Sequence, residues 1–407
     1  MLSGEAPGVR DEDELRAPPG APRHGRSPML RWLASYGTFS IPQAAAPIAF
    51  ALLAVPLTGR AEDGAAMVLA MTLAQVAGAI PVSRLGARFN AVTYLRLLVL
   101  VRTAALGLVA VLAGLHAPFA LLLSAAAAAG LVNGAAYGYQ RVILNYLVEP
   151  RGLPRALGIA ATLNEVSFAL SPVIASALGS VSPPLAICVL VLLGAGPLLC
   201  LPSVPDATAP RTTGSGRALL TPAILLWLLC TAAGSAAVAG VEVGAVSLAM
   251  SFGWEPSWGV VFTLALCLAS VSGGVFVSVR NRLSRDGEVV VFLAMTATGT
   301  VLVATGTHLV PTLAGAVLIG FFLPPLGTHY SLTLDRLAPA PQRAEVFALM
   351  RTANALGVIT LSALLALTDL TTALLGTMTL MLTVTLIATL NYATHRPNRH
   401  KSSSSTP

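Results

Sequence analysis

Long apolar stretches recur along almost the whole chain and constrain its fold more than any other feature. Crossing the roughly 30 Å hydrocarbon core of a bilayer takes about 20 apolar residues in an α-helix. Because lipid offers no hydrogen-bond partners to the backbone, such stretches cross as helices. The predicted spans are 30–57, 65–83, 92–115, 118–147, 156–179, 185–202, 219–250, 257–279, 288–307, 311–334, 344–367 and 370–393. We therefore predict an all-α membrane protein with twelve transmembrane helices.

Composition excludes a soluble protein. Only 10% of the 407 residues are charged, 55% are apolar and the mean hydropathy is +0.79, whereas roughly a quarter of the residues of a soluble domain are charged. The net charge of +7 would suit nucleic-acid binding, but the arginines lie in short loops between apolar stretches. Their placement points to membrane topology, so we do not expect nucleic-acid binding.

The spans divide the chain into two halves of six. We expect bundles at 30–202 and 219–393, joined by a linker at 203–218 that is rich in Pro, Ser, Thr and Gly. Residues 1–29 form a polar tail with no apolar face, and 394–407 form a basic, low-complexity tail, so both are expected to be disordered. The first apolar stretch begins too late and is too long for a secretory signal.

The distribution of positive charge predicts the orientation. Of the 24 lysine and arginine residues, four lie within predicted spans and one, Arg60, lies in a loop on the side opposite the termini. The remaining nineteen lie on the side shared by the two tails and the linker. Positively charged loops stay in the cytoplasm, so we predict a multi-pass protein of the cell membrane with both termini cytoplasmic.

The two halves also resemble each other. Arg155-Ala156 begins the fifth span and Arg343-Ala344 begins the eleventh, and the separation between these two pairs is almost the same as that between the starts of the first and seventh spans. Two repeats of six helices are the plan of many secondary transporters, whose substrate site lies at the interface of the repeats. We therefore expect two pseudo-symmetric six-helix bundles around a central site.

The loop after the second span adds a family resemblance. Ser83-Arg84-Leu85-Gly86-Ala87-Arg88 is similar to the G-x-x-x-D-R-x-G-R-R signature of the major facilitator superfamily. Arg84, Gly86 and Arg88 match, while Ala79 replaces the glycine and Ser83 the aspartate. The resemblance implies a cytoplasmic gate loop at these residues. In the family the aspartate joins a charge network that holds the halves together, so other groups are expected to replace it here.

Three further segments resemble efflux members of the superfamily that are common in actinobacteria. They are Gly240–Val243, the fifth span ending in Ser171-Pro172, and Asp335–Phe347 before the eleventh span. This resemblance implies an alternating-access transporter that exports a small organic molecule by proton antiport. It is silent on the identity of the substrate.

Glu165 and Arg141 are charged residues within predicted spans, where charge is costly and usually functional. At about 1.5 Å per residue, Glu165 lies roughly 15 Å beyond Arg155, and Arg141 lies roughly 12 Å before Glu149. The two are therefore expected to pair on neighbouring helices. Glu165 is the main candidate for binding and releasing a proton. The alternative is a static ion pair that fixes the two helices together.

Glu242, between Gly240 and Gly244 in the seventh span, is a second candidate for proton coupling. The alternative is a carboxylate at the level of the lipid headgroups. Arg102 in the third span is interpreted as a structural partner or a side chain that reaches towards the membrane surface. A histidine such as His329 is more often a packing group than a proton carrier. The expected substrate cavity comprises Asn133, Tyr137, Arg141, Asn164, His329, Arg351 and Asn354.

The charges within the spans favour an anionic or zwitterionic substrate, because Arg102, Arg141 and Arg351 outnumber Glu165 and Glu242. The four cysteines lie in apolar stretches without metal-binding spacing, so no metal, cofactor or disulfide is expected. No GxxxxGK[ST] phosphate loop is present, which disfavours a primary pump. We expect a monomeric transporter and no enzyme. An importer of a small nutrient and a membrane-embedded transferase are the alternatives.

Overall fold

The computed structural model describes residues 26–59, 62–179, 181–204, 220–306 and 308–395, and within these ranges every regular element is a helix. Twelve helical segments are long and apolar enough to cross a membrane, which confirms the predicted fold class. They are α1 (Arg26–Thr58), α2 (Glu62–Gly86), α3 (Ala91–Gly114), α4 (Phe119–Leu147), α5 (Leu153–Gly179), α6 (Pro183–Gly194) with α7 (Gly196–Cys200), α8 (Pro222–Glu242), α10 (Val260–Arg280), α11 (Asp286–Thr305), α12 (Leu309–Leu337), α13 (Arg343–Leu367) and α14 (Leu370–His395).

Short helices mark the junctions between spans. The seventh span breaks after Glu242 and continues as α9 (Ala245–Ser251), and one-turn helices η1 (Pro150–Gly152), η2 (Pro256–Gly259) and η3 (Ala340–Gln342) precede α5, α10 and α13. The expected tails and linker fall largely outside the described residues. The first helix already begins at Arg26, earlier than the predicted boundary at 30.

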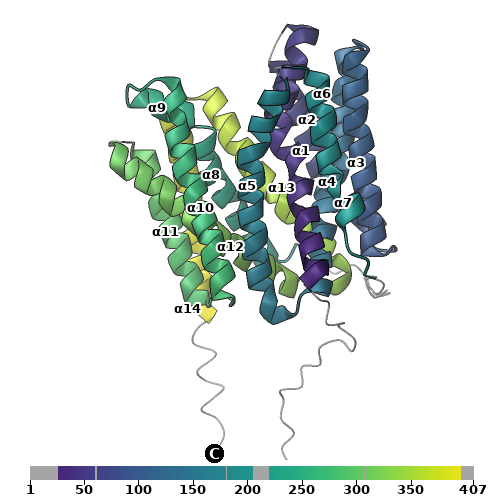
Figure 1. The fold of residues 1–407 in the computed structure, drawn as a ribbon. Helices are drawn as coiled ribbons and strands as arrows, with labels where there is room; N and C mark the ends of the chain where they lie inside the picture. Colours follow the sequence, from purple (N-terminus) through teal and green to yellow (C-terminus); the bar gives the residue numbers. More distant parts are fainter. Residues whose placement is uncertain (1–25, 60–61, 180, 205–219, 307, 396–407) are drawn as a thin grey trace, which may run out of the picture.

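The helices form two bundles. Figure 1 shows α1–α7, in purple to teal, on one side of the molecule and most of α8–α14 on the other, with α5 and α13 lying where the bundles meet. Helix α1 begins and α14 ends at the same end of the molecule, and we call this end the termini side. The break between α6 and α7 does not disturb this arrangement, since the two helices cross as one span.

The repeat aligns slightly differently from the sequence prediction. Helices α4 and α12 are both 29 residues long, and the one-turn helix that follows each of them begins at Pro150 in the first bundle and at Ala340 in the second. Superposing these elements makes Arg343 the counterpart of Leu153, the first residue of α5, and Glu345 the counterpart of Arg155. The predicted alignment of Arg343 with Arg155 is therefore wrong by two residues.

Glycines let the two bundles approach closely on the termini side. A Cβ at Gly138 of α4 would lie 2.4 Å from the carbonyl oxygen of Ala344 in α13, and one at Gly158 of α5 would lie 2.8 Å from that of Gly274 in α10. Neither position tolerates a side chain without moving the backbone. Close helix contacts in membranes depend on such small residues, so the bundles are pressed together at this end.

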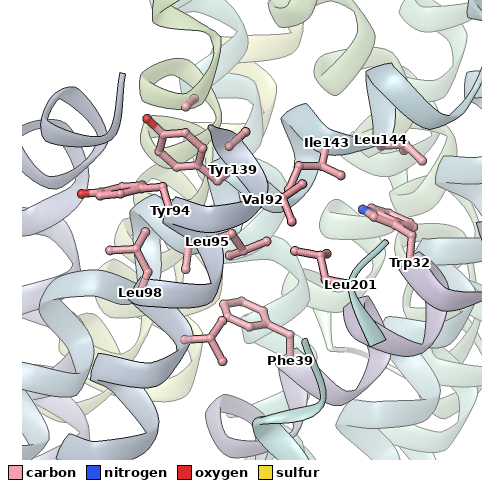
Figure 2. Packing of buried hydrophobic residues seen from close by; sticks show 14 of the residues in the cluster. Trp32, Phe39, Val92, Tyr94, Leu95, Leu98, Tyr139, Ile143, Leu144 and Leu201 are labelled. Atoms are coloured by element: carbon pink, nitrogen blue, oxygen red, sulfur yellow. The ribbon is translucent and has the colours of Figure 1, made fainter. Parts of the chain in front are cut away.

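An aromatic and aliphatic core fills the termini side of the first bundle (Figure 2). Trp32 is fully buried and its indole N–H donates to the carbonyl of Gln140 at 3.0 Å. Two tyrosine hydroxyls donate to the last turn of α2, Tyr94 to the Val82 carbonyl at 2.7 Å and Tyr139 to the Ser83 carbonyl at 2.9 Å. These bonds fix the start of the gate loop against α3 and α4.

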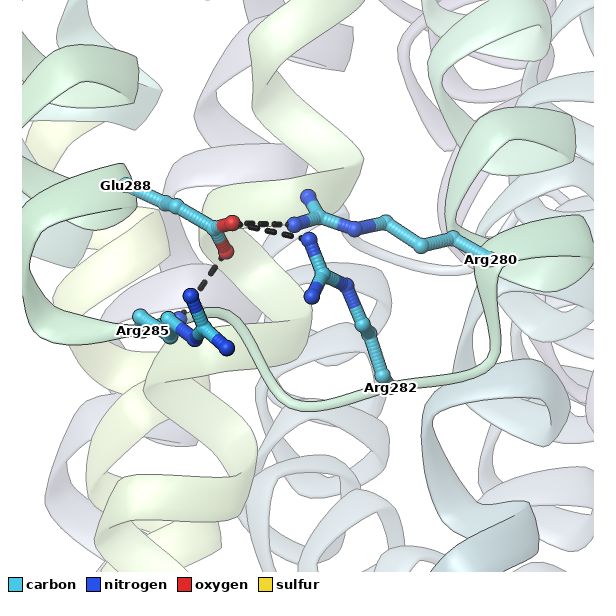
Figure 3. A network of polar contacts seen from close by, with 4 residues as sticks. All are labelled: Arg280, Arg282, Arg285 and Glu288. Atoms are coloured by element: carbon cyan, nitrogen blue, oxygen red, sulfur yellow. Dashed lines mark hydrogen bonds and ion pairs between the residues drawn. The ribbon is translucent and has the colours of Figure 1, made fainter.

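One carboxylate organises the loop between α10 and α11 (Figure 3). Glu288 pairs with Arg280 and with Arg282, the latter at 2.9 Å, and accepts the backbone N–H of Arg285 at 3.0 Å. A glutamate at the third residue of a helix that accepts the N-cap N–H stabilises the helix start. Several of the arginines that predicted the orientation therefore also stabilise the loop in which they lie.

Candidate functional site

A cavity of about 960 Å³ lies between the two bundles. Its wall is built from α1, α2, α4 and α5 of the first bundle and α8, α12 and α13 of the second, with Thr296 of α11. The lining reaches Ala51 of α1 and Ala363 of α13, near the ends of these helices that face away from the termini side, and Trp32 and Arg141 lie at its deep end. The cavity is thus open away from the termini side and closed towards it.

Helical periodicity places the lining residues. On α13, Phe347, Arg351, Asn354 and Val358 follow one another at intervals of four, three and four residues, the spacing of one helix face. The lining residues of α5 include Ala161, Asn164, Glu165 and Phe168 at similar spacing. The face of each helix away from the cavity packs within its bundle or faces lipid.

The deep end of the cavity is closed by a polar network between α4 and α12. Arg141 donates from Nε to the Ser331 hydroxyl and from Nη1 to Asn145 Oδ1, both at 2.6 Å. Asn145 Nδ2 donates to Asp335 Oδ1 at 2.8 Å, and Arg343 lies 3.5 Å from the same oxygen.

Two of these bonds, Arg141 to Ser331 and Asn145 to Asp335, join positions 190 residues apart. The same separation relates Pro150 to Ala340, the starts of η1 and η3, so each bond joins a residue to its counterpart in the other repeat. A residue that contacts its own counterpart lies close to the pseudo-two-fold axis. The network therefore closes the cavity on the axis that relates the two bundles.

The gate loop uses a different carboxylate from the family signature. Ser83 is buried and its hydroxyl donates to the Ala79 carbonyl within α2. Arg84 pairs instead with Glu345 of α13, at 3.0 Å, across the two bundles. A Cβ at Gly86 would lie 2.2 Å from the Tyr94 ring, which explains the glycine, and Arg88 is exposed. Glu345 thus supplies the negative charge that Ser83 cannot.

Glu165 lines the cavity, but it does not pair with Arg141 as the sequence had suggested. Arg141 lies six residues before the end of α4, while Glu165 lies twelve residues after the start of α5. At 1.5 Å per residue their depths differ by about 9 Å. Within the described residues Arg141 is instead directed to Ser331 and lies 4.7 Å above the Phe347 ring.

Glu242 is the last residue of α8 and lines the same cavity near its mouth. Glu165 of α5 lines the cavity as well. The two glutamates therefore form an acidic part of the wall, shared between α5 and α8, away from the arginines of the deep end.

Four other predicted cavity residues lie in the lining: Tyr137, Asn164, Arg351 and Asn354. The Arg351 guanidinium lies 5.3 Å from the Tyr137 ring centre, and the hydroxyls of Tyr36 and Tyr137 are 3.2 Å apart. Asn354 Oδ1 accepts from the Ser235 hydroxyl at 2.6 Å. Arginine, tyrosine and asparagine from both bundles thus surround the deep half of the cavity.

His329 does not lie in the cavity wall. It is buried on another face of α12, with its ring centre 5.0 Å from that of Trp227 and its Nε2 3.2 Å from the Thr333 hydroxyl. The helix face that meets the cavity carries Ser331 instead. This placement agrees with the packing role that the sequence left open for His329.

Asn133 lies behind the wall, in a network that the sequence did not predict. It accepts from Nη1 of the buried Arg102 at 3.1 Å and donates to Gln43 and, at 2.7 Å, to Gln75. Both glutamines line the cavity. The spacing of seven residues between Tyr36 and Gln43 on α1 was the available signal, because it places both on one face.

The described residues contain no group of three or more His, Cys, Asp or Glu side chains arranged to hold a metal ion. The site thus consists of two arginines, two glutamates, tyrosines and amides around an open cavity between two pseudo-symmetric bundles. Twelve membrane helices in two repeated bundles, with a polar cavity between them, are the architecture of many secondary transporters.

Comparison with known sequences identifies the family. The family model described as Major Facilitator Superfamily matches residues 32–362, and the chain belongs to this superfamily of transporters. No curated protein sequence matches the chain.

Solved structures share the fold at low sequence identity. A bacterial homologue of the iron transporter ferroportin in an outward-facing state has a TM-score of 0.77 at 15% identity, covering 90% of this chain and 99% of its own. The human organic anion transporter MFSD10 (TETRAN) has a TM-score of 0.69 at 15% identity, covering 91% of this chain and 100% of its own. At this identity the likeness concerns the fold alone.

Proposed function

We propose that the protein is a proton-coupled exporter of a small organic molecule that is anionic or zwitterionic, and that it works by alternating access. The observation that carries the proposal is the placement of Glu165 and Glu242 in one cavity with Arg141 and Arg351. Carboxylates can exchange protons with water in an open cavity, while arginines remain charged and attract anions. The cavity thus combines groups that can carry a proton with groups that can attract an anion, which supports the proposal.

The proposed roles follow from the position of each side chain. Glu165 and Glu242 bind protons when the cavity is open away from the termini side. The positive charges of Arg141 and Arg351 attract an anionic substrate into the cavity, and Tyr137, Asn164 and Asn354 contact it. Protonation removes the acidic charge from the wall, which lowers the cost of closing the cavity around it. Release of the protons on the other side leaves the site ready to load substrate again.

Alternating access requires the network on the termini side to break. The bonds of Arg141 to Ser331, Asn145 to Asp335 and Arg84 to Glu345 all join the two bundles there. We propose that these bonds form the cytoplasmic gate and that Ser83, Arg84, Gly86 and Arg88 act as its loop. The excess of arginine on the termini side supports a cytoplasmic location of that side in the cell membrane.

A proteoliposome assay tests the proposal. An imposed pH gradient should drive accumulation of an organic anion by the parent, and Glu165→Gln should reduce this gradient-driven flux by about a hundredfold or more, because an amide cannot carry the proton. Glu149→Gln serves as the matched control, since Glu149 is exposed between α4 and η1 and lies outside the cavity lining. It should transport like the parent.

The direction of the gradient response separates antiport from symport. Substrate accumulation inside the vesicles that is driven by an outwardly directed proton gradient supports antiport, and hence the exporter. Accumulation that is driven by an inwardly directed proton gradient supports symport, and hence the importer. Gradient-driven flux that survives intact in Glu165→Gln would remove Glu165 from proton coupling. An absence of gradient-driven flux in the parent, across organic anions and zwitterions, would reject the proposed function.

A further inference from the structure

Arg102 is a charged residue buried inside the first bundle, and within the described residues it forms no ion pair with a carboxylate. It is 3% exposed, and its guanidinium donates to the carbonyls of Phe39 and Gly194, at 3.0 and 2.9 Å, and to Asn133 Oδ1. The stretch 26–147 contains only two acidic residues, Glu62 and Asp63, and both lie at the start of α2, at the far end of the bundle. The partners of the Arg102 guanidinium among the described residues are thus carbonyl and amide oxygens and the face of the Phe39 ring, 4.0 Å away.

This charge dictates the orientation of three side-chain amides. An arginine can only donate hydrogen bonds, so Asn133 must present Oδ1 to Arg102 and turn Nδ2 the other way. Nδ2 donates to Oε1 of Gln43 and Oε1 of Gln75. Since the carbonyl end of each glutamine is taken, both glutamines turn their Nε2 groups away from Asn133. No other arrangement gives each of these contacts a donor and an acceptor.

The two glutamines bring this polarity to the cavity wall. Gln43 is half-buried and Gln75 is 1% exposed, and both line the cavity. Gln75 Nε2 is a buried donor without a hydrogen-bond partner among the described residues. Leaving such a donor unmade costs free energy, and the charge of Arg102 at the other end of the chain of amides strengthens the donors. At Gln43 and Gln75 the wall therefore presents amide donors, and Gln75 Nε2 has no acceptor among the described residues.

We infer that Gln43 and Gln75 form a binding site for the carboxylate group of the substrate, with Arg102 and Asn133 as positioning residues. The inference rests on the proposed function and names the chemical group that this part of the cavity binds. A carboxylate can accept hydrogen bonds from both amides, and its negative charge compensates the positive charge of Arg102. A group that can only donate, such as an ammonium or an N–H, meets donors and is disfavoured.

Three bicyclic probes that share a fused six- and five-membered ring frame test whether the wall presents donors or acceptors: indane-2-carboxylate as an anionic acceptor, 1-indanone as a neutral acceptor and indole as a neutral donor. Binding to the purified parent is measured by calorimetry. We expect the order carboxylate, ketone, indole, with about a tenfold difference between the first and the last, as for a hydrogen bond to a charged group.

Asn133→Asp should reverse the hydrogen-bonding polarity of Gln43 and Gln75 at the cavity wall, because aspartate has nearly the same shape as asparagine but can only accept. One oxygen of the aspartate still accepts from Arg102 and the other now accepts from the glutamines, which must turn their Oε1 atoms towards the cavity. Indole should then bind more tightly than 1-indanone. Asn164→Asp adds the same charge to the cavity outside the network, so it should weaken the carboxylate but keep ketone above indole. Gln43→Met should lose about tenfold in carboxylate affinity and little for indole.

A gain of indole affinity in Asn133→Asp cannot arise from misfolding, and Gln43→Met tests the site at a partly exposed position should Asn133→Asp fail to fold. A parent that does not prefer carboxylate to indole, or that binds none of the probes, overturns the inference. So does an Asn133→Asp protein with the order of the parent. Gradient-driven transport without the carboxylate preference leaves the proposed function intact, whereas the preference without gradient-driven transport rejects the function and retains the site.

Discussion

Two buried arginines on neighbouring helices of the first bundle, Arg102 and Arg141, donate their guanidinium hydrogen bonds to different partners. Both are nearly inaccessible, at 3% and 5% exposed, and neither pairs directly with a carboxylate in the described part of the chain. Arg102 donates only within its own bundle, to α1, α4 and α6. Arg141 donates to Asn145 on its own helix and to Ser331 on the other bundle.

The difference separates a fixed part of the molecule from a moving one. In alternating access each bundle moves largely as a rigid body, so bonds within a bundle persist and bonds between bundles break in every cycle. Arg102 therefore contributes to folding and to the orientation of the amide wall. Arg141 contributes to the equilibrium between the two open states. Substitution of the two arginines should separate stability from gating.

The largest effect is expected for Arg102→Met. The Gly194 carbonyl ends α6 at the break before α7, and Arg102 is its partner from α3. Removal of the guanidinium leaves this carbonyl, the Phe39 carbonyl and Asn133 Oδ1 without that donor. At about 1 kcal/mol each, we expect a loss of roughly 3 kcal/mol in the free energy of unfolding. Thermal unfolding in detergent measures it.

Arg141→Met is the matched substitution for comparison. Asn145 keeps its bond to Asp335, and Ser331 lines the cavity, where water can reach it. We expect a stability loss well below that of Arg102→Met, of about 1 kcal/mol or less. Equal losses for the two variants would show that the bond to the second bundle supports the fold as strongly as the bonds within the first.

Arg141→Met should also make the termini side open more readily. Ala348 of α13 is fully buried beside Gly138 of α4, so a cysteine there becomes reactive only when the termini side opens. In a protein whose four native cysteines are replaced by alanine, Arg141→Met should raise the labelling rate of Ala348→Cys about fivefold, since one interbundle bond is worth roughly 1 kcal/mol. Unchanged labelling would exclude Arg141 from the gate.

The same comparison shows what the sequence could and could not predict. The span count, the two halves and the charged residues of the spans follow from local patterns, because hydropathy and arginine placement need no partner. Contacts between helices depend on register. Aligning Arg343 with Arg155 makes His329 the counterpart of Arg141, whereas the alignment of the helices in the structure makes it Ser331.

Two residues correspond to about 200° around a helix, enough to turn the predicted side chain away from the cavity. The expected pair of Glu165 with Arg141 failed for a related reason. Boundaries that are uncertain by a few residues shift depth by several ångströms, and ion pairs form only within about 4 Å. The amide network was missed because its uncharged side chains, which join three helices to Arg102 on a fourth, leave no signal in charge or hydropathy.

The smallest effect is expected at the gate loop, where Arg84 pairs with Glu345. The Arg84 side chain is 61% exposed and Glu345 only 6%, so water screens the pair and its contribution is below about 1 kcal/mol. Glu345→Gln should therefore raise the labelling of Ala348→Cys only about twofold, less than Arg141→Met does. Arg84→Gln should have the same effect, and the double variant should add nothing further if the pair is the whole of the interaction. Additive effects would instead show that Glu345 closes the gate through contacts other than Arg84.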